Sequence, residues 1–271
     1  QIHLSSAFLK DKIKERISEG EGNALLFPVK KIKNPLVIMV GCIKYNFKEK
    51  ADLPGTKEEL GKIKKLFEEI YKYKVVSTYV EGDPATEVQK GKDILRFCTE
   101  QQKYLKENSD KYDGVFFIYS GHGNANTILD SYGKEIGLYK IKEMFDLTNL
   151  PEMVNKPKIF LFSKCRGADT TIPVKIGKEL YHPEKDFIEI YGNPEGFQIK
   201  DNPPDGAFLI HELSDWLTNV DGVRKLSLTD IFTLMNNSVQ YSSKHTEVVV
   251  QEVKTGYKVY LEPNNLPAST P

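Results

Sequence analysis

NKPKIFLFSKCRGAD, residues 155–169, is the stretch that decides the fold. It contains a continuous apolar run, Ile159 to Phe162, bounded by Pro157 and Gly167. A run of this length with such boundaries is typical of a strand buried on both faces, as in a parallel sheet. In open α/β sheets, reactive groups gather just beyond the carboxyl ends of such strands. Cys165 lies at that position, so the sequence predicts a reactive thiol at the edge of a sheet.

A second apolar run, Gly114 to Tyr119, ends in the same way and is followed by Ser-Gly-His-Gly at residues 120–123. Neighbouring strands would bring the imidazole of His122 to the same edge as the thiol of Cys165. Peptide hydrolysis by a cysteine needs a nucleophile, a proton donor for the leaving amine and N–H donors for the oxyanion. His122 can supply the proton, and the backbone N–H groups of Gly123 and Cys165 can face the oxyanion. The pair predicts a cysteine protease.

The same residues have simpler interpretations. A free cysteine is often a small buried hydrophobe, and this is the interpretation we favour for Cys42 and Cys98. Cys165 differs because it lies at a strand end between Lys164 and Arg166. Among the five histidines, only His122 lies between glycines after an apolar strand. The sequence has no set of metal ligands at a useful spacing, so we expect neither a metal nor a cofactor.

Composition narrows the class of protein. The 271 residues include 38 basic and 38 acidic side chains, and this zero net charge gives no indication of nucleic-acid binding. Three irregularly spaced cysteines argue against a disulfide framework and favour a reducing compartment. No apolar run approaches the roughly 18 residues of a membrane span, and no signal peptide is visible. We therefore expect a cytoplasmic protein without nucleic-acid or membrane partners, although the start at Gln1 leaves open a longer N-terminal region.

Strand and helix patterns alternate from residue 35 onward. They predict an α/β fold, a doubly wound three-layer sandwich around a mostly parallel six-stranded sheet. The predicted strands cover residues 35–42, 74–80, 114–119, 159–162, 186–191 and 247–253, with a further short strand at 258–261. Thr56 and Glu59 have the spacing of a capping box at the start of a helix. Residues 1–34 are treated as an N-terminal extension without chemistry.

The order Ser-Gly-His-Gly and then Cys-Arg-Gly, with the histidine about 40–50 residues upstream of the cysteine, resembles the caspase-like cysteine peptidases. These include caspases, metacaspases and paracaspases, and the resemblance extends from about Leu36 to Glu262. It implies Cys165 as nucleophile, His122 as general acid and base, and Gly123 with Cys165 as oxyanion donors. It also implies protein or peptide substrates and a role in regulated cell death.

The resemblance divides the catalytic domain into a large-subunit-like part at 35–165, an intersubunit-like linker at 166–185 and a small-subunit-like part at 186–271. Caspases are cut in this linker, where the candidate processing sites are Asp169, Lys175, Lys178 and Lys185. Activity as an intact chain is equally open. The strand at 247–253 matches the one that pairs across the caspase dimer axis, which implies a homodimer. Its charged flanks can instead mark a protected, monomeric edge.

The chain departs from the caspase pattern in the pocket for the P1 side chain. Caspases have Gln-Ala before the cysteine and grip a P1 aspartate with two arginines, whereas this chain has Ser163 and Lys164. The two arginine positions fall at Leu53 and Asp201. A pocket of Leu53, Ser163 and Asp201 has lost its positive charge, so burying an acidic P1 side chain there is costly. Asp201 can pair with a P1 arginine or lysine, as in metacaspases and paracaspases, or be an exposed loop carboxylate.

Two rival functions remain open. The first is a pseudo-peptidase that regulates an active homologue, since Lys164 can mark a degenerate site. Strand alternation places Lys164 on the face opposite Cys165, which makes a direct effect on the pKa of the thiol doubtful. The second rival is a flavodoxin-like binding module, but residues 41–44 after the first strand are not a glycine-rich phosphate loop.

Overall fold

The computed structural model describes residues 28–164, 184–192, 207–243 and 248–264. Its main sheet has six strands in the order β3-β2-β4-β7-β8-β9. Their bounds are β2 (Leu36–Gly41), β3 (Lys74–Ser77), β4 (Val115–Ser120), β7 (Lys158–Ser163), β8 (Phe187–Tyr191) and β9 (Val250–Lys254). Neighbouring strands run parallel except at the β8–β9 edge, which is antiparallel. The predicted α/β fold with a mostly parallel six-stranded sheet is confirmed.

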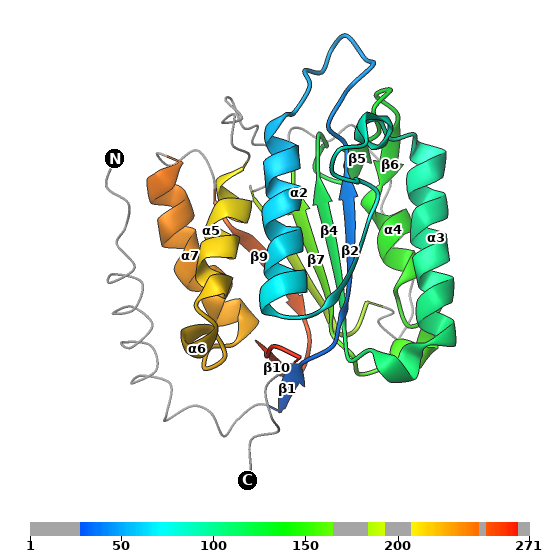
Figure 1. Cartoon of the computed structure of the whole chain (residues 1–271). Helices are drawn as coiled ribbons and strands as arrows, with labels where there is room; N and C mark the ends of the chain where they lie inside the picture. Colours follow the sequence, from blue (N-terminus) through cyan, green and yellow to red (C-terminus); the bar gives the residue numbers. More distant parts are fainter. Residues whose placement is uncertain (1–27, 165–183, 193–206, 244–247, 265–271) are drawn as a thin grey trace.

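Helices cover both faces of the sheet (Figure 1). One layer contains α2 (Gly55–Lys65), α5 (Phe208–Thr218), the short α6 (Val220–Val223) and α7 (Leu228–Ser242). The other contains α3 (Gly91–Glu107) and α4 (Leu138–Met144). Each layer packs on the sheet through its own cluster of buried apolar side chains. This explains why β2, β4, β7 and β8 are buried at every residue and consist mostly of apolar residues.

Two small sheets flank the main one. A parallel pair joins β1 (Val29–Ile32) to β10 (Lys258–Leu261). An antiparallel hairpin joins β5 (Thr127–Leu129) to β6 (Glu135–Gly137). None of the helices in these described ranges is long and apolar enough to cross a bilayer.

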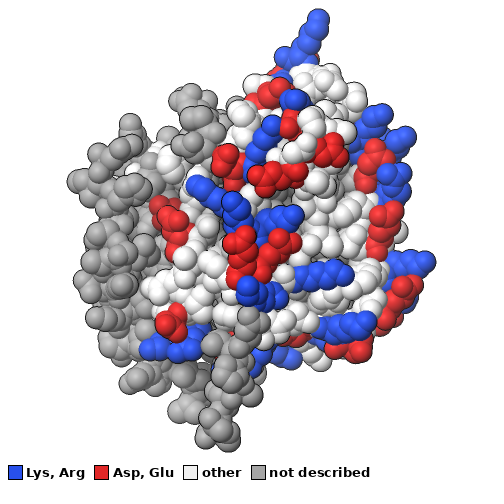
Figure 2. All heavy atoms as spheres, in the orientation of Figure 1, with Lys and Arg blue, Asp and Glu red and all other residues white. Residues whose placement is uncertain are grey.

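Acidic and basic side chains lie close together over the face seen in Figure 2. Some of them belong to α2, whose sequence contains both acidic and basic residues. The described part of this face therefore carries positive and negative side chains that are mixed over the surface.

The predicted capping box at the start of α2 is wrong. The N-cap residue is Pro54 and has no side-chain cap, so Thr56 already lies within the first helical turn. The buried Thr56 hydroxyl lies 3.1 Å from the hydroxyl of Ser120 at the end of β4. The Glu59 carboxylate also points to that strand end instead of back to the helix terminus. Both side chains therefore belong to the edge of the sheet where the predicted site lies.

Candidate active site

The strands that precede the predicted histidine and cysteine, β4 and β7, are neighbours in the main sheet. In the parallel pairing of these strands, Ser120 is the register partner of Ser163. His122 follows Ser120 by two residues, and Cys165 follows Ser163 by two residues. Because hydrogen-bonded strands lie about 4.8 Å apart, the last residues of β4 and β7, from which both positions continue, lie side by side at one edge of the sheet. Cys165 itself lies outside the described residues.

The imidazole of His122 is held from two sides. Its Nε2 lies 2.9 Å from the carbonyl oxygen of Ala51. A carbonyl oxygen only accepts, so Nε2 carries the hydrogen and the Nδ1 of the neutral ring is left as an acceptor. The ring of Tyr45 packs against it with the centroids 4.6 Å apart. Burial lowers the pKa of His122, and nearby Lys50 lowers it further against the opposing effect of the Ala51 carbonyl. The ring is therefore neutral near pH 7 and able to accept a proton.

The backbone of His122 is fixed by two buried tyrosines. Its N–H donates to the Tyr45 hydroxyl at 2.8 Å, and its carbonyl accepts from the Tyr119 hydroxyl at 2.8 Å. The same carbonyl accepts from the N–H of Leu129 at 2.9 Å. Polar groups on both sides of the residue are thus engaged, which holds the main chain of His122 in one orientation.

The glycines on either side of His122 are required by close packing. A Cβ at Gly121 would lie 2.5 Å from the Tyr119 hydroxyl oxygen. A Cβ at Gly123 would lie 2.6 Å from the carbonyl oxygen of Thr127 and 2.6 Å from Cδ of Lys164. The Ser-Gly-His-Gly sequence therefore satisfies the packing of this loop, whatever its role in chemistry.

The predicted P1-pocket residues divide into described and undescribed positions. Leu53 is buried, and its N–H donates to the carbonyl of Ile43 at 2.8 Å. Ser163 is buried at the end of β7, and its side chain hydrogen-bonds to Glu59. Asp201 lies outside the described residues, and so do the candidate processing sites Asp169, Lys175 and Lys178. Lys185 is described and exposed.

Glu59 is the site residue that the sequence did not reveal. Its carboxylate is 3% exposed and accepts hydrogen bonds of 2.6 Å from the Ser120 hydroxyl and from the N–H of Ala207. Burial raises the pKa of Glu59 to about 6 despite these bonds, so the group is more often ionised than protonated at pH 7. It lies four positions before the buried Ile63 on the same helix face. That spacing, which places a carboxylate within an apolar stripe, was the available signal.

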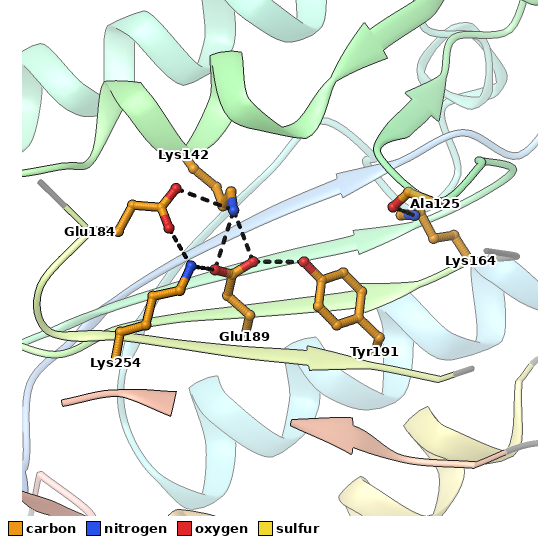
Figure 3. Close-up of polar contacts among 7 residues, drawn as sticks. All are labelled: Ala125, Lys142, Lys164, Glu184, Glu189, Tyr191 and Lys254. Atoms are coloured by element: carbon orange, nitrogen blue, oxygen red, sulfur yellow. Dashed lines mark hydrogen bonds and ion pairs between the residues drawn. The ribbon is translucent and has the colours of Figure 1, made fainter. Parts of the chain in front are cut away.

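A second buried carboxylate lies farther along the sheet. Glu189 of β8 is fully buried, 2.7 Å from the Nζ of Lys254 and 3.1 Å from the Nζ of Lys142 (Figure 3). The Tyr191 hydroxyl donates to it at 2.6 Å. Glu184 pairs with both lysines as well. Although burial opposes ionisation, the two lysines and Tyr191 hold the pKa of Glu189 below its usual value. We call these residues the Glu189 network; it joins α4, β8 and β9.

The cysteines in the described ranges are inert. Cys42 and Cys98 are both buried and free, in agreement with their predicted structural role. Burial raises the pKa of each thiol to about 12, so neither is a thiolate near neutral pH. Within the described ranges, no group of three or more His, Cys, Asp or Glu side chains could hold a metal ion.

The chain is similar in sequence to known proteins. Residues 35–260 match the family model of the caspase domain. The chain is 28% identical to caspase-3 of Mesocricetus auratus over 142 residues, which cover 49% of this chain and 50% of that protein. It is 30% identical to caspase b of Danio rerio over 135 residues, 46% of this chain and 33% of that protein. These matches span only a third to a half of the curated relatives.

The architecture also matches a solved structure. The crystal structure of caspase-1 from Spodoptera frugiperda superposes with a TM-score of 0.67, covering 87% of this chain and 92% of that chain. The sequence identity over this match is 13%, so the likeness is one of fold.

Proposed function

The chain belongs to the caspase family, and on that premise we propose that it is a cysteine endopeptidase that cleaves protein substrates. One observation supports the proposal: β4 and β7 pair in a register that sets Ser120 beside Ser163, two residues before His122 and Cys165 respectively, and His122 is held by the Ala51 carbonyl. Membership of this family leaves no support for a flavodoxin-like binding module.

In the proposed mechanism, Nδ1 of His122 takes the proton of the Cys165 thiol, and the thiolate attacks the substrate carbonyl carbon. The N–H groups of Gly123 and Cys165 face the oxyanion that forms. His122 then gives its proton to the leaving amine as the C–N bond breaks, which leaves a thioester on Cys165. A water molecule, deprotonated by His122, hydrolyses that thioester and restores the free thiol. No cofactor enters these steps.

We propose further that the pocket prefers arginine or lysine at P1. The support is the charge of Glu59, which is hydrogen-bonded to Ser163, two residues before Cys165. A buried carboxylate attracts a cationic side chain and repels an acidic one, and desolvating an unpaired P1 aspartate there is costly. Leu53 supplies an apolar wall, and Asp201 remains a candidate for a second carboxylate.

The assembly of the active form is part of the proposal. Residues 35–165 and 186–271 correspond to large and small subunits within one catalytic domain, and 166–185 to the linker between them. The strand predicted at 247–253, described as β9 (Val250–Lys254), lies at the edge of the main sheet. An edge strand can pair with a second copy of the chain, which is the arrangement proposed here for a homodimer.

A peptide library tests the function. The wild type is expected to cut after arginine or lysine, whereas Cys165→Ala and His122→Ala are expected to cut nothing above background. An electrophilic peptide should alkylate Cys165 faster than it alkylates Cys42 or Cys98 in the unfolded chain. If the wild type cuts no peptide and Cys165 reacts no faster than those two thiols, the chain is a pseudo-peptidase. Cleavage strictly after aspartate would contradict the proposed preference for a basic P1 side chain but would not contradict the catalytic pair.

A further inference from the structure

We propose that Lys164 is a positioning residue, whose ammonium group holds the turn at residues 123–125 so that the N–H of Gly123 faces the oxyanion. The inference rests on the proposed peptidase function for the role of that N–H. The contact between Lys164 and the turn can be tested without it.

Lys164 is buried, although lysine is rarely buried unless its charge is compensated. It directly follows the last residue of β7 and directly precedes Cys165. Its Nζ donates to the carbonyl oxygens of Asn124 and Ala125, the second of these at 3.3 Å (Figure 3). Hydrogen bonds from a charged donor are stronger than those between neutral groups, so two successive carbonyls are fixed in one direction.

The aliphatic part of Lys164 fixes the residue before those carbonyls. Its Cδ lies where a Cβ on Gly123 would come within 2.6 Å. The stem therefore packs against the α-carbon of Gly123 while the ammonium group binds the next two peptides. One side chain thus contacts three consecutive residues of the loop that follows His122.

This geometry also orients the N–H of Gly123. The peptide between His122 and Gly123 is planar, so its N–H points opposite to the His122 carbonyl. That carbonyl is engaged by Tyr119 and by the N–H of Leu129. Lys164 holds the opposite end of the turn, where the N–H of Asn124 also donates to Thr127 at 3.0 Å. The N–H of Gly123 is fixed between these two anchors and cannot rotate without breaking one of them.

The buried ammonium group of Lys164 also lies near an aromatic ring. The Nζ of Lys164 lies 5.9 Å from the ring centroid of Tyr191, within the range of a cation–π interaction. The hydroxyl of Tyr191 is bound to Glu189, as Figure 3 shows. Caspases carry a small alanine at the position before the cysteine. In this chain the surroundings of that position accommodate a lysine and provide contacts for its ammonium group.

The test compares Lys164→Met, which keeps most of the stem and removes the ammonium group, with the wild type. Hydrogen exchange of the backbone amides at 123–127 is expected to rise about tenfold, as for the loss of a charged hydrogen bond, while exchange in β2 and β4 stays unchanged. With a peptide substrate, kcat is expected to fall about 10²-fold at unchanged KM, as for a misplaced oxyanion donor. Affinity for a peptide aldehyde, which forms a tetrahedral adduct, should fall in parallel.

The matched control is Lys158→Met. Lys158 is also a buried lysine of β7 and donates to the Met153 carbonyl at 2.7 Å, but it lies at the other end of the strand. The Lys158→Met variant is expected to change the stability of the fold without changing kcat or the hydrogen exchange of the amides at 123–127. Lys164→Arg, which retains the charge and donors, is expected to recover both readouts at least in part.

Unchanged exchange at 123–127 in Lys164→Met overturns the positioning role, whatever the activity. If the wild type is inactive but hydrogen exchange rises in the variant, the peptidase function is rejected while the contact between Lys164 and the turn is supported. If Lys164→Met does not fold, the same test is made with Lys164→Gln, which has a shorter, uncharged side chain. The proposal then requires that hydrogen exchange at 123–127 rises in this variant. Protection equal to the wild type in that variant overturns the proposal.

Discussion

A carboxylate in the interior of a protein is retained at a cost that its hydrogen bonds only partly offset. Glu59 accepts from Ser120, Ala207 and Ser163, yet burial still raises its pKa to about 6. Of its buried neighbours on the same face of α2, Ile63 is apolar and Thr56 is polar but uncharged. A buried group with a raised pKa at the end of a parallel strand is typical of a functional site.

Glu59→Gln is expected to lower kcat/KM for peptides with P1 arginine or lysine by about tenfold or more, because one close charge pair is lost. Peptides with a neutral P1 side chain should be cut at nearly the wild-type rate. The control is Glu58→Gln, which removes the adjacent exposed carboxylate. Equal losses for basic and neutral P1 side chains would show that Glu59 supports the site without selecting the substrate.

The same residue makes stability depend on pH in a defined direction. The pKa of Glu59 is higher in the folded chain than its ordinary value of 4.5, so folding favours the protonated acid. Its contribution to the free energy of unfolding is greatest below pH 4.5 and falls as the pH rises to about 6. At 1.36 kcal/mol per pKa unit, the loss is about 2 kcal/mol. Urea titrations from pH 4 to 7 should show this loss in the wild type and in Glu58→Gln, but not in Glu59→Gln.

At the scale of single elements, the strands were predictable because a strand that is buried on both faces has an apolar sequence. The runs at 36–41, 115–120 and 158–163 are almost wholly apolar and end in glycine or serine. The location of His122 near the strand end was predictable because it follows the apolar run of β4 by two residues and lies between two glycines. These signals arise from residues that are close together in the chain.

Glu59, Lys164 and Glu189 escaped prediction because their partners are distant in sequence. The bond from Glu59 to Ala207 spans 148 positions, and the bonds from Glu189 to Lys142 and Lys254 span 47 and 65 positions. Only the strand order of the folded sheet brings such residues together. A single charged residue within an apolar run indicates a buried partner but does not identify it.

The Glu189 network yields a prediction for β8 and β9. Among the described residues, Glu189→Gln leaves Lys142 and Lys254 with Glu184 as their remaining counter-charge. Breaking a buried pair in this way costs about 3 kcal/mol or more. The pKa of Glu189 is lowered in the folded chain, so its contribution is present above pH 4.5 and is lost as the pH falls through the folded pKa. Urea unfolding at pH 7 should therefore reveal the deficit, and unfolding at pH 3 should reveal less of it. The exposed Glu143 on α4 offers the control Glu143→Gln.

At the scale of the whole molecule, the strand order determines what happens when the chain is cut. Residues 166–185 connect β7 to β8, yet those two strands are neighbours within the sheet, paired from Lys158 with Phe187 to Phe162 with Tyr191. Strand β8 also pairs with β9, and Lys142 of α4 binds both Glu184, near the end of the linker, and Glu189, beyond it. The two parts of the chain therefore share one core and are not separate folding units.

Cleavage within the linker, at Lys175, Lys178 or the exposed Lys185, is accordingly expected to leave both fragments bound to each other under native conditions. Limited proteolysis by trypsin followed by size-exclusion chromatography tests this: the nicked protein should elute as the intact chain does and separate into two fragments only in denaturant. Nicked Glu189→Gln should separate at a lower denaturant concentration, because the network that spans the cut is weakened. Fragments that part without denaturant would mean that the pairing of β7 with β8 does not hold the two parts together.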